Sequence, residues 1–261
     1  MRKFSPSKKS KLEYRKALKQ FDSQACEAIA LSQSSSGIFA KPTIGRGTHV
    51  FGRMCARSVS ILNASPKSRW SKSWYPNYDL ASIASHTRAL LEGYLLLSYL
   101  LKAPLDEDTQ RAYSTLLHLY DCIKRQKILP HVLPDTEIDW FKQEAVRLKM
   151  VLEQTAFFGS LTKREKKAAL SGSHLMFITS LEAADAVGFG RKEYEFYWNY
   201  LSQYTHIFSL QFYRLEPNSR GTGIENEFDL DAMKMTLTFG AMILERSSNL
   251  MVETFPDTAP A

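Results

Sequence analysis

Apolar residues recur along most of this chain at the spacing of an α-helix, and this periodicity constrains the fold more than any other feature. The clearest stripe is Tyr14, Leu18, Phe21, Ala25 and Ile29, whose members are separated by steps of four, three, four and four residues. Such steps place side chains on one face of a helix. No segment alternates apolar and polar residues convincingly, and no turn signal joins two β-branched runs. The sequence therefore predicts an all-α protein, a single-domain helical bundle of about eight helices with a basic N-terminal extension.

Capping residues and clusters of glycine and proline indicate where the helices begin and end. Ser10 with Glu13, and Thr162 with Glu165, have the form of capping boxes, in which two side chains satisfy backbone N–H groups reciprocally. The stretch SQSSSGIFAKPTIGRG is expected to separate the first two helices. Helices are predicted near 10–32, 48–63, 174–187, 191–214 and 229–254, and others are predicted to open at Asp79, Asp106, Asp135 and Thr162.

Three segments are expected from this pattern. Residues 1–47 are predicted to form a basic N-terminal helix and linker, 48–254 the main bundle, and 255–261 a frayed tail. A hydrophobic content of 44% and an aromatic content of 12% are sufficient for one sizeable core.

The sequence also predicts where in the cell the protein is located. The longest apolar run, Ala89–Leu101, is shorter than the roughly 20 residues that a membrane-spanning helix requires. The basic start MRKFSPSKKSK is not followed by the apolar segment of a secretory signal. Cys26, Cys55 and Cys122 are scattered and odd in number, which suggests no disulfide framework. A cytoplasmic protein without membrane association is expected.

Charge is distributed unevenly along the chain. Residues 1–78 hold 15 Lys/Arg and three Asp/Glu, which gives a net charge of +12. Residues 79–261 hold 19 Lys/Arg and 24 Asp/Glu, which gives −5, and the two values sum to the formal net charge of +7. No acidic residue lies between Glu27 and Asp79. A sustained positive potential of this kind typically faces phosphates or an acidic protein surface. A solvated basic arm, or neutralisation by the acidic remainder of the fold, is the alternative.

The segment RWSKSWYPNY interleaves cations with aromatic side chains. Bases that stack on aromatic rings, with the phosphate backbone neutralised nearby, are typical of sequence-tolerant single-strand binding. The alternative is a loop whose tryptophans pin it to the bundle. The candidate nucleic-acid-binding residues of the basic region are Arg46, Arg53, Arg57, Lys67, Arg69, Trp70, Lys72 and Trp74.

The aromatic stretch YWNYLSQYTHIF carries Ser202 and His206 four residues apart, which would place them on one helical face. Histidine exchanges a proton near neutral pH, so His206 is a candidate general acid or base. The alternative is a histidine hydrogen-bonded inside the bundle, with the Ser202 hydroxyl donating to the carbonyl of Trp198.

A second pair, Arg88 and Glu92, lies in the Leu-rich stretch SHTRALLEGY, again four residues apart. An ion pair in such surroundings is costly to bury unless something makes use of it. Two interpretations stay open. The pair could fix helix packing, or Arg88 could present its guanidinium to an anion while Glu92 holds it in position.

Together the two stretches resemble an uncharacterised bacterial family of helical proteins, in which an Arg-x-x-x-Glu helix precedes a Tyr-x-x-Leu-Ser-x-x-x-His helix. The matching positions are Arg88 and Glu92, then Tyr200 or Tyr197, Leu201, Ser202 and His206, and the similarity covers roughly residues 50 to 250. More distantly, the layout is similar to HEPN domains of prokaryotic toxins and defence proteins. That resemblance implies a homodimer and RNA cleavage by an Arg-x(4–6)-His motif.

The sequence departs from that motif, because no arginine lies four to seven residues before His206. We therefore expect a HEPN-like protein that engages RNA or another polyanion, with metal-independent ribonuclease activity left open. Arg88 would then bind the anion and Glu92 would hold Arg88 in position. His206 would transfer the proton, and Ser202 would orient His206 or contact the phosphate. The rival hypothesis is a non-catalytic adaptor that binds a protein partner. No metal site, nucleotide-binding loop or common cofactor motif is found.

Overall fold

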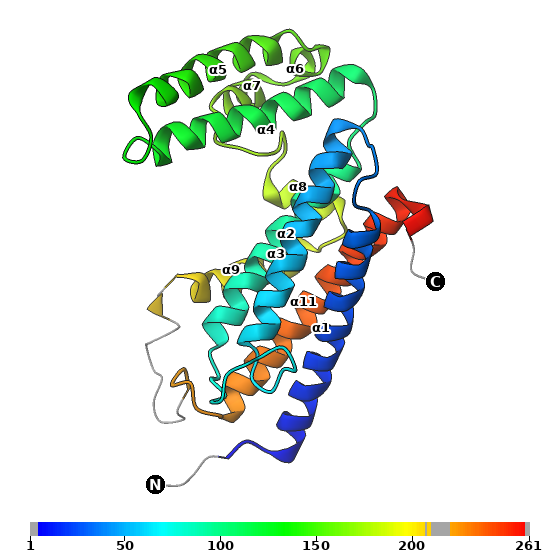
Figure 1. The fold of residues 1–261 in the computed structure, drawn as a ribbon, viewed down its shortest axis with the longest axis vertical. Coiled ribbons are helices and arrows are strands. Elements are labelled where there is room, and N and C mark those ends of the chain that lie inside the picture. The colour runs from blue at the N-terminus through cyan, green and yellow to red at the C-terminus, as the bar shows by residue number, and fades with distance from the viewer. Residues whose placement is uncertain (1–4, 207, 210–219, 259–261) are drawn as a thin grey trace. The chain divides into compact units, whose positions relative to one another are not determined.

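The computed structural model describes residues 5–206, 208–209 and 220–258, and this part of the chain is helical without a β-strand (Figure 1). The all-α prediction is confirmed. Tyr78 and Gly223 form an isolated antiparallel bridge. The ten α-helices of the described residues are α1 (Lys8–Ser34), α2 (Pro42–Ala64), α3 (Leu80–Leu101), α4 (Glu107–Ile128), α5 (Asp135–Glu153), α6 (Ala156–Ser160), α7 (Lys163–Leu170), α8 (Ser180–Ala186), α9 (Arg191–Thr205) and α11 (Glu227–Thr254), followed by the 3₁₀ turn η1 (Pro256–Thr258).

The capping predictions are partly confirmed. The reciprocal box of Thr162 and Glu165 opens α7, and both of its hydrogen bonds are present. The predicted box at Ser10 is wrong, because the N-cap of α1 is Ser7, whose side chain accepts a hydrogen bond from the backbone N–H of Ser10. The hydroxyl of Ser10 instead donates to Glu227 of α11, at 2.8 Å. A tertiary contact therefore takes the side chain that the local pattern assigned to the cap.

Three other boundaries differ clearly from the predictions. α8 begins at Ser180 and not near residue 174, because the Thr179 hydroxyl accepts a hydrogen bond from the backbone N–H of Glu182 and caps the helix there. α2 begins at Pro42 and not near residue 48, because proline fits the first turn of a helix, where its missing N–H would have no partner. α9 ends at Thr205 and not near residue 214, and residues 210–214 of that prediction lie outside the described residues.

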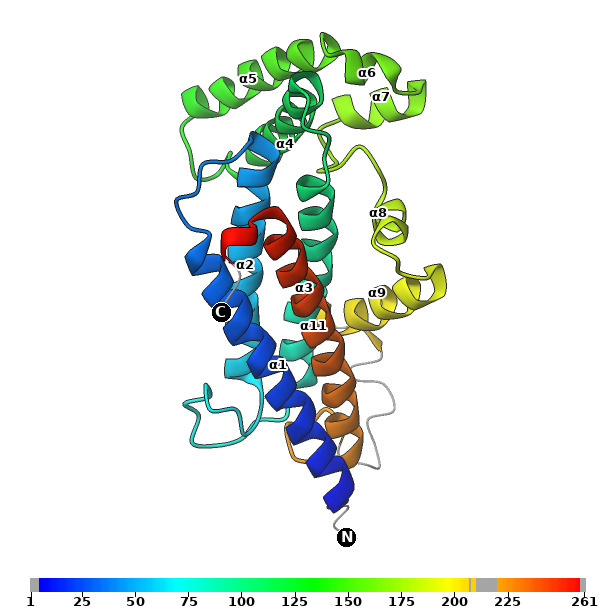
Figure 2. The ribbon, with the colours of Figure 1, turned by 90° about the vertical axis from the view of Figure 1, so that its right-hand side faces the viewer.

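The chain divides into two compact units. The first unit comprises the described residues of 1–38, 48–98 and 184–261 and contains α1, α9, α11 and most of α2 and α3. α1 and α11 pack side by side (Figure 2). Their close approach requires a glycine, because a Cβ at Gly240 would lie 2.8 Å from the ring of the fully buried Phe21. Of the tail predicted to fray, residues 256–258 form η1 and Phe255 is buried.

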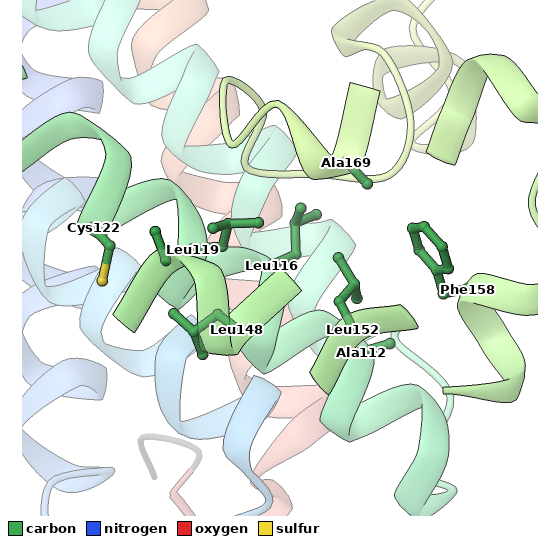
Figure 3. Close-up of a cluster of buried hydrophobic side chains, with 9 residues drawn as sticks. Ala112, Leu116, Leu119, Cys122, Leu148, Leu152, Phe158 and Ala169 are labelled. Carbon is green, nitrogen blue, oxygen red and sulfur yellow. The ribbon is translucent and has the colours of Figure 1, made fainter. Parts of the chain in front are cut away.

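The second unit comprises residues 39–47 and 99–183 and contains α4, α5, α6 and α7. Its core is built where α4 and α5 pack together and α6 and α7 close over them. Gly172 ends α7 with a φ of +61°, and a side chain there would also meet Ile123. The buried core side chains, most of them labelled in Figure 3, are Ala112, Leu116, Leu119, Cys122, Ala145, Leu148, Leu152, Phe158 and Ala169.

None of the described helices combines the length and the apolar character needed to cross a lipid bilayer.

Candidate anion-binding cavity

A cavity of about 350 Å³ lies within the first unit, between α2, α3 and the end of α9. It brings together residues that are more than a hundred positions apart in the sequence, including all four that were selected as candidate catalytic residues. Exposed residues among the lining, such as Glu92 and His206, show that the cavity is open to solvent. We call it the α3/α9 cavity. Its charged and polar lining includes Arg57, His86, Arg88, Glu92, Ser202 and His206.

Arg88 is the most buried cation of the cavity, with 9% of its surface exposed. Its guanidinium lies over the ring of Trp198, with 3.1 Å between Cζ and the ring centroid. Nε donates a hydrogen bond to the hydroxyl of Ser202 at 3.2 Å, and Nη1 lies 2.6 Å from a carboxylate oxygen of Glu92. Arg88 therefore ties α3 to α9, which is the packing interpretation of this residue.

The same contacts leave N–H donors of the Arg88 guanidinium with which an anion could form hydrogen bonds. The contacts of Arg88 with described residues engage Nε and Nη1, and arginine has five N–H donors in all. Burial lowers the pKa of Arg88, and Glu92 opposes that effect. Arginine has the highest pKa of the ionisable side chains, so Arg88 remains charged at neutral pH. An anion in the cavity would therefore meet a fixed, partly desolvated positive charge.

The hydroxyl of Ser202 both donates and accepts a hydrogen bond. Its hydroxyl donates to the carbonyl of Trp198 at 2.6 Å, one helical turn earlier, and accepts the hydrogen bond from Arg88. The bond to Trp198 is the structural alternative foreseen for this serine. Ser202 thus orients Arg88, and its proton is already committed to the backbone.

His206 does not lie on the helical face that the sequence suggested. α9 ends at Thr205, and His206 is its C-cap with an extended backbone at φ −116° and ψ 152°. The backbone N–H of His206 donates to the carbonyl of Ser202 at 3.4 Å. The side chain is exposed, lines the cavity and lies 5.2 Å from the ring of Phe208, measured between centroids.

Two further residues complete the cavity. Nη1 of Arg57, an exposed residue of α2, lies 3.3 Å from Nδ1 of His86 on α3. Because arginine can only donate, this contact favours a neutral imidazole whose proton is on Nε2. Burial, and secondarily the charge of Arg57, lowers the pKa of His86. Sequence reasoning selected Arg57 only as part of the basic region and gave His86 no role, although His86 stands two residues before Arg88.

The charge of the lining favours an anion. Arg57 and Arg88 contribute two positive charges and Glu92 one negative charge, so the lining carries +1 while both imidazoles are neutral. Each imidazole that takes up a proton adds one positive charge. A bound anion would therefore be stabilised by the two guanidinium groups and would favour protonation of His86.

The other candidates from the basic region fall into two groups. Arg69 and Trp70 are held by Asp22, since Arg69 donates to its two oxygens at 2.6 and 3.1 Å and the indole of Trp70 donates at 2.7 Å. This part of the loop is pinned to α1, as the structural alternative for it requires. Trp74, by contrast, is 95% exposed and lies beside Tyr75, with 5.9 Å between ring centroids. Besides Arg69, the exposed cations among these candidates are Arg46, Arg53, Arg57, Lys67 and Lys72.

Three exposed basic residues of α2 lie along one face of the helix. His49, Arg53 and Arg57 follow one another at intervals of four residues, and all three are exposed. Residues at this interval lie on the same face of a helix. The stripe, which we call the α2 basic face, leads to the cavity at Arg57. Arg46 lies nearer the start of α2 and belongs to the second unit.

Comparisons with known proteins identify no relative of this chain. No family model, no curated protein and no solved structure matches the sequence or the fold. The resemblance to the bacterial helical family and to HEPN domains therefore stays a prediction. In the part of the chain that the structure describes, no group of three or more His, Cys, Asp or Glu side chains is placed to hold a metal ion.

Proposed function

We propose that this protein binds RNA, with one phosphate group held in the α3/α9 cavity and neighbouring phosphates held on the α2 basic face. The observation that carries the proposal is the convergence of Arg57, Arg88, His86 and His206 on one solvent-open cavity of about 350 Å³. Phosphates are recognised in proteins by arginine forks, assisted by partial desolvation of the site. A protein-binding adaptor would give no reason for these four side chains to share one recess.

Features of the same unit that lie outside the cavity lining favour a polyanion over a single small anion. α2 contains no acidic residue, so nothing on the helix opposes the field of the α2 basic face. The exposed ring of Trp74 offers a stacking surface that is independent of base identity. Lys67 and Lys72 are exposed on the same loop. Cations with an exposed aromatic ring are the combination expected for an unpaired strand.

Cleavage of the bound strand is a second candidate function, which two histidines in one cavity favour. A phosphodiester held at the mouth of the cavity by the exposed Arg57, with the charge of Arg88 in the recess, could be attacked by its own 2′-hydroxyl. One imidazole would remove the proton of that hydroxyl and the other, protonated, would give a proton to the leaving 5′-oxygen. Atoms and charges balance without a further reactant. We assign the proton transfer to His206 with His86, and the orientation of the arginine to Ser202 and Glu92.

Binding is tested by fluorescence anisotropy of a labelled single-stranded RNA at salt concentrations between about 50 and 200 mM. We expect Kd to rise steeply with salt. Arg57→Gln should reduce the slope of log affinity against log salt by about 0.7, since one phosphate contact is lost. Arg191→Gln is the matched control, because Arg191 is also an exposed arginine of the first unit but pairs with Glu195. A flat salt response, or equal losses in the two variants, would refute the proposal.

Cleavage is tested on the same RNA by gel electrophoresis. His206→Ala should abolish product formation while the Tm remains unchanged, because the His206 side chain is exposed. His174→Ala removes an exposed histidine of the second unit and should have no effect on either measurement. If wild-type protein binds the strand and never cuts it, binding stands and the cleavage assignment is withdrawn.

The adaptor alternative rests on a different surface. α5 of the second unit exposes three large apolar side chains, Trp140, Val146 and Met150, each with more than half of its surface accessible. Exposed apolar residues that gather on one helix are typical of protein interfaces. Loss of RNA binding in every assay above, together with a partner lost on Trp140→Ser, would favour the adaptor.

A further inference from the structure

The two guanidinium groups of the α3/α9 cavity differ in accessibility. Arg57 is exposed, whereas the side chain of Arg88 is only 11% exposed and is held in place by Trp198, Ser202 and Glu92. The cavity thus presents one cation to solvent and one in a recess. A phosphate that contacts both must enter the recess and leave the surface of the molecule.

A phosphate within a strand and a phosphate at its end are not equally able to do this. A phosphodiester carries two substituents that leave in different directions, so both flanking sugars would have to follow it into the recess. A phosphomonoester carries one substituent and three terminal oxygens, so it can enter with the strand leaving by a single route. Its charge of about −1.5 to −2 at neutral pH also matches two arginines better than the single charge of a diester does.

The RNA strand would leave the cavity along the α2 basic face. Arg53 and His49 lie one and two helical turns from Arg57, which corresponds to about 6 Å along the helix axis for each step of four residues. This spacing is comparable with the separation of neighbouring phosphates in an extended single strand. The cavity volume of about 350 Å³ falls at the lower end of the range for ligand sites, so the cavity has room for a terminal phosphate with its nucleoside.

We propose that the α3/α9 cavity recognises the terminal phosphomonoester of a single-stranded RNA, whose following phosphates lie on Arg53 and His49. This inference rests on the proposed RNA binding and deepens it, because it names the feature of the strand that the cavity reads. Arg57 and Arg88 would contact the terminal phosphate, and Glu92 and Ser202 would hold Arg88 in position.

The test uses one RNA sequence in three forms, with a 5′-phosphate, with a 3′-phosphate and with hydroxyl groups at both ends. The oligonucleotides carry 2′-O-methyl groups so that no strand can be cut during the measurement. We expect one of the two phosphorylated forms to bind the intact protein about tenfold more tightly than the form without phosphate, as the gain of charged hydrogen bonds requires. The form that binds more tightly shows whether the cavity recognises a 5′-phosphate or a 3′-phosphate.

Variants separate the cavity from the stripe. Arg57→Gln should remove the preference for the phosphorylated end, and Arg53→Gln should weaken all three forms alike while the preference remains. Both residues are exposed, so both variants should fold. Equal affinity for the three forms with salt-dependent binding retained would overturn end recognition and leave the proposed function intact. Loss of measurable binding for all three forms would overturn both.

Discussion

The sharpest test of the site geometry is the replacement of Arg88 by methionine, which keeps an unbranched stem of similar length and removes the guanidinium. Three contacts would be lost, the stacking on Trp198 at 3.1 Å, the hydrogen bond to Ser202 at 3.2 Å and the ion pair with Glu92 at 2.6 Å. All three connect α3 to itself or to α9. The variant therefore asks whether Arg88 holds these two helices together in solution.

The expected magnitude follows from the burial of each partner. A partly desolvated cation over an indole stabilises by about 1–2 kcal/mol, and the hydrogen bond from the guanidinium adds about 1 kcal/mol. The ion pair adds about 0.5 kcal/mol, because the Glu92 side chain is 56% exposed and solvent screens the charge. Methionine recovers about 1 kcal/mol, since a thioether costs nothing to desolvate and fills the same space. The net loss is about 2 kcal/mol, or a decrease in Tm of roughly 4–8 °C.

The assay is thermal unfolding followed by circular dichroism, with Arg57→Met as the control. Arg57 is exposed and its side chain contacts His86, so its replacement should leave Tm almost unchanged. Near-equal Tm values for the two variants would refute the reasoning, since they would show that the contacts of Arg88 with Trp198 and Ser202 do not contribute to stability. A large decrease for Arg88→Met alone would confirm that Arg88 has a packing role besides any contact with an anion.

Three further predictions concern packing and pH. Gly240→Ala should lower the free energy of unfolding, measured in urea, by about 1–3 kcal/mol, because the new Cβ would lie 2.8 Å from the buried ring of Phe21. This loss should exceed the gain from the better helix propensity of alanine. A more stable variant would contradict the packing of α1 on α11. Burial raises the pKa of Asp22, but hydrogen bonds, chiefly from Arg69, prevail and hold this pKa below its ordinary value. The stability that Asp22 contributes is therefore present above its unfolded pKa and lost as pH falls through the lower folded value, so the difference between wild type and Asp22→Asn should be largest near pH 7 and vanish in strong acid. Burial and a neighbouring arginine lower the pKa of His86, and a bound phosphate would raise it again. RNA affinity should consequently increase as pH falls from about 8 to 6, and this increase should be lost as pH rises through the pKa that His86 has in the RNA complex. An unchanged pH profile in His86→Gln would show that another group is responsible.

The secondary structure could be predicted from the sequence wherever its causes are local. The box of Thr162 and Glu165 and the N-cap Asp106 were predicted correctly, because each acts within one helical turn. The start of α1 was misplaced, since Ser10 is engaged by Glu227, a residue 217 positions away. Pro42 was read as a helix breaker, because the same residue type both ends helices and opens them.

The sequence by itself determined that the chain would be helical, that its basic charge would gather before residue 78, and that Arg88, Glu92, Ser202 and His206 merited attention. Only the tertiary structure decided what these side chains do. It placed Arg88 against Ser202 across 114 residues, added Arg57 and His86 to the same cavity, and used Arg69 and Trp70 to bind Asp22. Helix periodicity and capping depend on neighbours within a few residues, whereas the partner of a long polar side chain depends on which helices pack together, and no local pattern carries that information.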